Sequence, residues 1–212
     1  MAATRNYGGV SAADRRAIRR TALFEAALDL VTEEGASAVT KKAVCVRAGL
    51  TDRYFYEHFA DRDALVESLA HELTEQGLAA GLAAIVAAEP QIPAQVHAAI
   101  EAAATFIDED PRRGALLMCA PTIDAIQRAR KDAISTVANT LSALIPELTG
   151  DDPADRTDTD MVCFTLIAGL VELGVAWLRG EFAVSRQHFI DLATAILLSG
   201  MRIPSQLPAS PT

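Results

Sequence analysis

The stretch TKKAVCVRAGLTDRYFYEHF, residues 40–59, has the pattern of two short helices joined by a tight turn. Thr40 is suited to cap the first helix, because its hydroxyl can accept a hydrogen bond from an amide of the first turn. Gly49 stands where the end of a helix needs a positive φ, and Thr51 is suited to cap a second helix. The second helix of such a helix–turn–helix fits the major groove of DNA.

A longer amphipathic helix precedes this stretch. Ser11 can cap it, apolar residues from Leu23 to Val31 recur at the spacing of one buried face, and Gly35 ends it. We therefore expect a helix–turn–helix domain over residues 1–62, with helices at about 11–34, 41–48 and 52–59.

At this point the chain resembles the TetR family of bacterial transcription regulators. The resemblance is carried by Gly35, Thr40, the run RAGLT at 47–51, Tyr56, His58–Phe59 and the run DRDAL at 61–65. The sequence departs from the family pattern at Cys45, Val46 and the acidic Asp52. The resemblance implies a three-helix DNA reader followed by a helical effector-binding domain. It also implies a homodimer formed through the last two helices, which represses transcription from a pseudo-palindromic operator until a ligand releases it.

Several residues of the motif are candidates for DNA contacts. Lys41 and Lys42 oppose the helix dipole in the first turn, an unfavourable arrangement that a nearby phosphate would reverse. Arg53 and Tyr54 lie early in the second helix and are the candidates for base edges. The resemblance adds Tyr56 and Arg62 as phosphate contacts. The complete candidate set is Thr40, Lys41, Lys42, Thr51, Arg53, Tyr54, Tyr56 and Arg62.

The charge of the chain is divided unevenly. The net charge of −9 separates into +2 for residues 1–62 and −11 for residues 63–212. Basic charge therefore gathers at the amino end, as expected for a local DNA-binding patch. Arg15, Arg16, Arg19 and Arg20 form a basic cluster on the first helix, for which phosphate contact and a solvated surface are equally good interpretations.

Residues 63–212 are expected to form an all-α effector-binding and dimerisation domain, which gives about nine helices in all. The expected helices lie at about 62–88, 94–108, 112–119, 123–148, 160–179 and 185–201, with an acidic surface loop at 149–159. The last two helices are apolar around most of their circumference, which calls for a second subunit as cover. Five large or soft side chains are candidates to line an apolar or amphipathic effector pocket: Phe106, Met118, Cys119, Phe164 and Trp177. For each of them packing in the core is the favoured alternative, and for Trp177 the dimer interface is another.

Catalysis, metals and membranes have little support in the sequence. No nucleophile, phosphate-binding or dinucleotide motif is present, so we expect neither an enzyme nor a cofactor. His71/Glu75 and His97/Glu101 have i, i+4 spacing, and polar surface positions are favoured over a metal site for both pairs. Three widely spaced cysteines suit a reducing compartment. With no uncharged apolar run of about 18 residues and no signal pattern, the chain is expected to be cytoplasmic.

Two rival functions stay open on the sequence alone. The helix–turn–helix can serve a dimeric small-molecule-binding or protein-interaction module that has no DNA affinity. A helical carrier or enzyme is the other rival, and turnover without DNA binding would favour it. Salt-dependent DNA affinity separates the DNA-binding regulator from both alternatives.

Overall fold

In the computed structural model the described residues, 11–119, 124–149 and 156–204, are helical except for short connections. The elements in chain order are α1 (Ala12–Glu34), the 3-10 turn η1 (Ala36–Ala38), α2 (Lys41–Ala48), α3 (Asp52–Tyr56), α4 (Arg62–Ala87), α5 (Ile92–Glu109), α6 (Pro111–Met118), α7 (Asp124–Thr149), α8 (Arg156–Leu178) and α9 (Arg186–Gly200). The expected all-α class is confirmed over this part of the chain.

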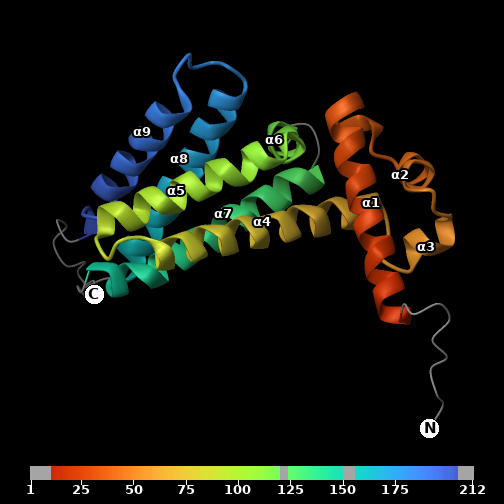
Figure 1. Cartoon of the computed structure of the whole chain (residues 1–212), viewed down its shortest axis with the longest axis horizontal. Coiled ribbons are helices and arrows are strands. Elements are labelled where there is room, and N and C mark those ends of the chain that lie inside the picture. The colour runs from red at the N-terminus through yellow and green to blue at the C-terminus, as the bar shows by residue number, and fades with distance from the viewer. Residues whose placement is uncertain (1–10, 120–123, 150–155, 205–212) are drawn as a thin grey trace, which may run out of the picture.

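Helices α1 to α3 form a head at one end of the molecule. Helix α1 stands between α2 and α3 on its outer side and the remaining helices on its inner side (Figure 1). Ser11 begins α1 with a capping box, in which its hydroxyl accepts from the Asp14 amide while the Asp14 carboxylate accepts from the Ser11 amide. Apolar side chains of α1 fill the core of the head together with Val44, Phe55 and Phe59.

The core of the head continues beyond residue 62. Leu65, Val66 and Leu69 of α4, Leu116 of α6 and Ile126 of α7 are buried in the same cluster as the apolar side chains of α1. Helix α1 packs on α6 more extensively than on α4. The head is therefore joined to the larger domain by a continuous apolar core, and α6 supplies the broadest contact with α1.

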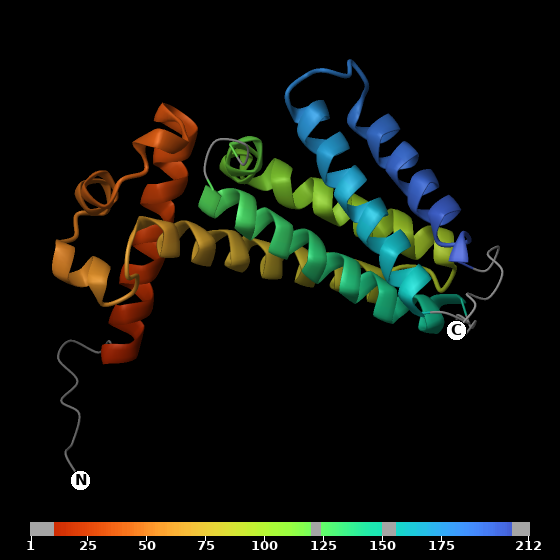
Figure 2. The same cartoon turned by 180° about the vertical axis from the view of Figure 1, so that it is seen from behind.

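Helices α4 to α9 form a bundle with its own smaller core. Val96 of α5, Ala138 and Ile145 of α7, Cys163 of α8 and Leu197 of α9 are buried together. Helix α4 runs from the head along the bundle, between α5 and α7, and α8 and α9 lie at the far end, as the reverse view shows (Figure 2).

Helix α8 is unusually apolar for a helix with so much exposed surface. Among the described residues it is the one helix whose length and composition would suit a membrane span, and only 17% of its most apolar window is buried in the monomer. The sequence-based expectation required an uncharged run, whereas α8 carries Glu172 within its apolar part. Glu172 pairs with Arg130 of α7, whose side chain is 14% exposed. This ion pair links α8 to α7, the helix on which α8 packs most extensively.

The structure corrects three expected boundaries. The second helix of the motif ends at Tyr56 rather than at residue 59, because the amide of His58 turns back to the Phe55 carbonyl at 3.0 Å. Helix α5 begins at Ile92, with Pro93 in its first turn, where a missing amide is harmless. Helix α8 begins at Arg156, so residues 156–159 of the expected loop are helical. The rest of that loop beyond Thr149 lies outside the described residues.

Candidate nucleic-acid interface

The turn between α2 and α3 has the geometry that a helix–turn–helix needs. The Thr40 hydroxyl accepts from the Ala43 amide at 3.1 Å and caps α2. Gly49 has φ of 64° and ψ of 29°, the left-handed region, and the Leu50 amide then donates to the Cys45 carbonyl at 2.9 Å. Thr51 occupies the cap position of α3, but its hydroxyl makes no capping bond. That exposed residue can therefore offer its hydroxyl to DNA.

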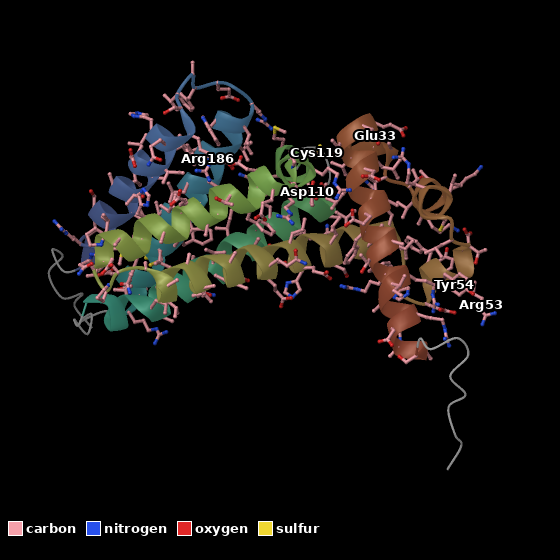
Figure 3. All side chains as sticks on the ribbon, viewed as in Figure 1. Glu33, Arg53, Tyr54, Asp110, Cys119 and Arg186 are labelled. Atoms are coloured by element: carbon pink, nitrogen blue, oxygen red, sulfur yellow. The ribbon has the colours of Figure 1, made fainter. Side chains whose placement is uncertain are left out.

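Arg53 and Lys42 are exposed cations of the motif, and a third, Arg47, pairs with Glu33 and Glu34 of α1. The Arg53 side chain is 85% exposed, and it lies at the outer tip of the head (Figure 3). It pairs with Glu57, one turn later, with Nε 3.5 Å from Oε1. Such an exposed pair contributes only about 0.3–0.5 kcal/mol, so Arg53 can leave it for a stronger partner. Lys42 is exposed on the first turn of α2.

Lys41 is held in a cluster with Asp52 and Tyr56. Its ammonium group pairs with the Asp52 carboxylate and lies 3.4 Å from the Tyr56 hydroxyl and 5.0 Å from the centre of the Tyr56 ring. The hydrogen bonds to Asp52 and then Tyr56 raise the pKa of Lys41. Tyr56 itself is 58% exposed. The cluster fixes a tyrosine hydroxyl and a cation side by side on the surface of the head.

Tyr54 and Arg62 are more strongly engaged within the protein than the sequence predicts. The Arg19 guanidinium lies 4.5 Å from the centre of the half-buried Tyr54 ring. Arg62 donates to the Ala36 carbonyl at 3.2 Å and so ties the start of α4 to η1. Tyr54 is therefore a less accessible base-reading residue than Arg53. The expected phosphate contact of Arg62 would have to use the 32% of its side chain that is exposed.

The basic cluster of α1 binds groups of α4 and of the residues that follow α3. Arg16 donates to the Glu57 carbonyl at 2.9 Å, Arg19 pairs with the Glu57 carboxylate at 3.1 Å, and Arg20 pairs with Glu72 of α4. The same arginines surround His58, and burial first, then Arg16 and Arg19, lower the pKa of His58. Because Arg16, Arg19 and Arg20 bind partners within the protein, phosphate binding is at most a secondary role of this cluster.

These elements and their order match a known family. Residues 23–69 match the model of the bacterial regulatory proteins of the tetR family. The amino-terminal domain is a TetR-family domain. No curated protein matches the chain.

Solved structures extend the similarity beyond the TetR-family domain to the whole fold. A proposed transcriptional regulator of Pseudomonas aeruginosa PAO1 matches with a TM-score of 0.69 at 18% identity, over 94% of this chain and 97% of its own. The fatty acid degradation regulator FadR from Bacillus halodurans matches with a TM-score of 0.66 at 13% identity, over 85% of this chain and 98% of its own. A TetR-like transcriptional regulator from Rhodococcus sp. RHA1 matches with a TM-score of 0.63 at 16% identity, over 87% of this chain and 96% of its own. The chain has the fold of TetR-family regulators.

The five side chains predicted to line an effector pocket do not converge. Trp177 stacks on Phe189 of α9 with ring centres 4.7 Å apart, and Phe164 is 43% exposed on α8. Cys119 packs against the core of the head, and the Met118 carbonyl accepts from Arg179 at 3.0 Å. The prediction of a shared lining is therefore corrected, because tertiary packing separates residues that hydropathy alone could not distinguish.

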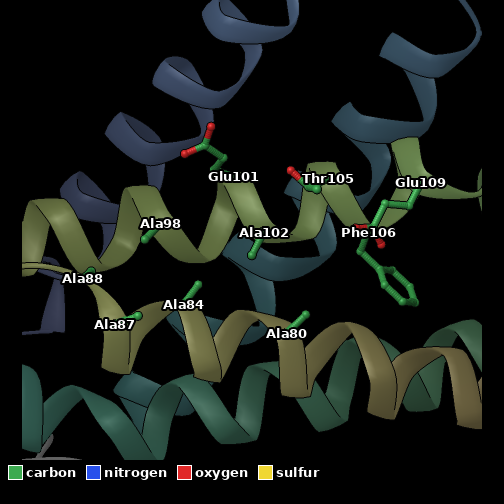
Figure 4. A pocket seen from close by; sticks show the side chains of 10 residues that line it. All are labelled: Ala80, Ala84, Ala87, Ala88, Ala98, Glu101, Ala102, Thr105, Phe106 and Glu109. Carbon is green, nitrogen blue, oxygen red and sulfur yellow. The ribbon is translucent and has the colours of Figure 1, made fainter.

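Phe106, one of the five predicted pocket residues, lines a groove between α4 and α5. This open groove has a volume of about 450 Å³, with Glu101, Thr105 and Glu109 along its α5 side. Its remaining lining is small and apolar: Ala80, Ala84, Ala87, Ala88, Ala98 and Ala102. The alanines of the two helices point toward one another, and the Phe106 ring lies at one end (Figure 4). Alanine gives no strong periodic signal, which is why the sequence did not indicate this groove.

The histidine pairs form separate surface contacts. His71 lies 3.3 Å from Glu75, and both side chains are mostly exposed. His97 lies 4.0 Å from Glu101 and 3.5 Å from Asp191 of α9. Within the described ranges, no group of three or more His, Cys, Asp or Glu side chains is arranged to hold a metal ion.

Proposed function

We propose that the protein is a DNA-binding transcriptional regulator that binds a pseudo-palindromic operator as a homodimer. The observation that carries this proposal is the tip of the TetR-family domain. There the exposed Arg53 stands at the start of α3, and Lys42 of α2 and Tyr56 of α3 are exposed as well. The amino-terminal residues of a recognition helix contact base edges, while the flanking groups contact phosphates.

The apolar outer faces of α8 and α9 support the dimer. Met161 and Phe164 on α8 are 64% and 43% exposed, and Leu192 on α9 is 44% exposed. A second copy of the same two helices would cover these side chains through a two-fold interface. The same symmetry would present two copies of α3 to half-sites one DNA turn apart, about 34–36 Å. A regulator with this surface covered would work in the cytoplasm, without a membrane.

Release by a small molecule is the proposed form of control, with repression as the outcome of binding. The groove between α4 and α5 is the candidate effector site, because it is mostly apolar and lies along the helix that enters the head. A ligand that prefers a splayed arrangement of the two heads by a few kcal/mol would empty the operator. We infer a tilt of α4 as one route for that change, and the broad packing of α1 on α6 gives a second.

The test is the salt dependence of DNA binding by the full-length protein. Fluorescence anisotropy with duplexes from the flanking intergenic DNA, at several salt concentrations, measures affinity and its slope. Lys42→Ala and Arg53→Ala should each weaken binding, and removal of a cation that binds phosphate should lower the slope by about 1. Lys131→Ala, which removes an exposed lysine of α7, is the matched control and should bind as the parent does. A parent protein without salt-dependent affinity would reject the proposal and favour an interaction module.

A further inference from the structure

Asp52 is an acid at the place where a DNA reader is expected to be basic or neutral. It is the first residue of α3, and 60% of its side chain is exposed. A carboxylate there repels phosphate, so it would weaken binding unless it met a hydrogen-bond donor. Asp52 was not among the residues that the sequence predicted to contact DNA. An acidic residue at the start of the second helix of the motif was the feature that could have indicated such a contact.

The structure brings Asp52 together with Cys45, the other unusual residue of the motif. The Cys45 side chain is buried at 4% exposure beneath the start of α3. Burial first, then the charge of Asp52 and a side-chain hydrogen bond to it, raise the pKa of Cys45. The thiol therefore stays protonated beside the Asp52 carboxylate.

Lys41 holds the same carboxylate from α2. Its ammonium group pairs with Asp52 Oδ2, and the Tyr56 hydroxyl lies 3.4 Å from that ammonium group. This internal donor fixes the orientation of Asp52, and the positive charge of Lys41 offsets part of the repulsion between the Asp52 carboxylate and the DNA backbone. An ionised carboxylate has about four lone-pair positions, so acceptor capacity remains on its exposed side.

The chemistry of the major groove limits what Asp52 can accept from. The only hydrogen-bond donors on base edges there are the amino groups of cytosine N4 and adenine N6. Adenine places an acceptor, N7, beside its amino group, and a carboxylate has no donor for it. Cytosine presents its amino group without that neighbouring acceptor, which makes cytosine the better match.

We propose that Asp52 is a specificity-determining residue that accepts a hydrogen bond from the amino group of a cytosine in each half-site. Lys41 acts as the positioning residue for its carboxylate. The inference rests on the proposed DNA-binding function and adds one position of the operator to it. Arg53, the next residue, would donate to a neighbouring guanine, so the pair reads two adjacent bases with opposite hydrogen-bonding character.

The experiment is selection of binding sites from random duplex DNA by the full-length protein and its variants. Asp52→Asn keeps the size of the side chain and replaces an acceptor by an amide, which pairs with adenine N6 and N7. Preference for cytosine at one position per half-site should fall roughly ten- to 150-fold, the value of one hydrogen bond to a charged group, with adenine gaining. Asp52→Ala should lose the cytosine preference without a gain in adenine, which keeps the test decisive if the amide variant folds poorly.

Glu33→Gln is the matched control. Glu33 is 57% exposed and also pairs with a cation of α2, with Oε2 2.9 Å from Arg47, but it lies at the opposite end of α1 from Arg53 (Figure 3). Loss of its charge should leave the selected motif unchanged. A purely structural role for Asp52 would lower affinity for all sequences alike and leave the base frequencies as they are, and that result would overturn the inference. A parent protein that selects no motif would instead overturn the proposed function.

Discussion

Arg112 joins the head to the bundle, and its replacement by methionine tests that junction. Arg112 stands in the first turn of α6, and its Nη1 lies 2.7 Å from Asp29 Oδ1 while its Nη2 lies 2.7 Å from Glu25 Oε2, both on α1. The same guanidinium binds Asp110 at 2.8 and 2.9 Å. Methionine keeps much of the apolar stem and removes every one of these charged hydrogen bonds.

The loss of stability in Arg112→Met can be estimated from the exposure of Arg112 and its partners. The side chains of Arg112, Asp29 and Asp110 are 28%, 35% and 19% exposed, so screening by water is incomplete. Exposed ion pairs contribute about 0.2–1 kcal/mol each, and hydrogen bonds to less exposed charges contribute about 1.5–3 kcal/mol. We expect Arg112→Met to lower the free energy of unfolding by about 1.5–3 kcal/mol. For a chain of this size that corresponds to a fall in Tm of about 3–12 °C.

The pH dependence of this loss has a definite sign. The hydrogen bonds from Arg112 lower the pKa of Asp110 below its ordinary value of 3.8. A folded-state pKa below the unfolded one gives stability that is present above the unfolded pKa and is lost as pH falls through the folded pKa. The parent protein should therefore lose stability more steeply below about pH 4 than Arg112→Met, so the difference between the two should narrow in acid.

Thermal and urea unfolding at one fixed protein concentration measure these changes. Arg128→Met is the control, because Arg128 also binds a carboxylate through two nitrogens, at 3.1 and 2.8 Å from Glu67 Oε1, but is 58% exposed and links two helices of the bundle. That variant should lose much less stability than Arg112→Met does, because water screens this exposed ion pair. Equal losses from the two variants, or an Arg112→Met loss that is the same at pH 7 and pH 3, would refute the reasoning.

Three further predictions concern the bundle. A Cβ at Gly200 would lie 2.5 Å from Leu166 Cδ1, so Gly200→Ala should lower the free energy of unfolding by about 1–3 kcal/mol in thermal unfolding. Gly81→Ala is the control, because the nearest atom to a Cβ at Gly81 is 3.9 Å away. That variant should raise the free energy of unfolding by up to about 1 kcal/mol. Burial raises the pKa of Cys163 to about 11. In a variant with Cys45→Ala and Cys119→Ser, a thiol reagent at pH 8 should therefore label Cys163 only as fast as the protein unfolds. Rapid labelling of the native state would contradict this prediction. Phe164→Glu on α8 should raise the dimer dissociation constant roughly tenfold or more in sedimentation, because it would bury a charge in the interface. Val86→Glu, at an 87% exposed position on α4, should leave the dissociation constant unchanged. Equal effects of the two variants would show that α8 is not part of the interface.

The sequence by itself determined the local architecture of the head. Caps at Ser11 and Thr40 and the left-handed turn at Gly49 were predictable, because each depends on hydrogen bonds and backbone angles within a few residues. The helical class and the order of the bundle helices followed from apolar periodicity over single segments. The exposed position of Arg53 followed in the same way from its place in a short helix.

Only the tertiary structure decided which side chains of the candidate site are occupied by partners within the protein. Tyr54 lies under Arg19 of a different helix, Asp52 is fixed by Lys41, and Arg112 reaches α1 across 83 positions. Hydropathy and spacing carry no information about such contacts, since they arise when separate helices pack and bring distant charges together. The groove between α4 and α5 is also a product of packing, because two runs of alanine leave room that larger side chains would have filled.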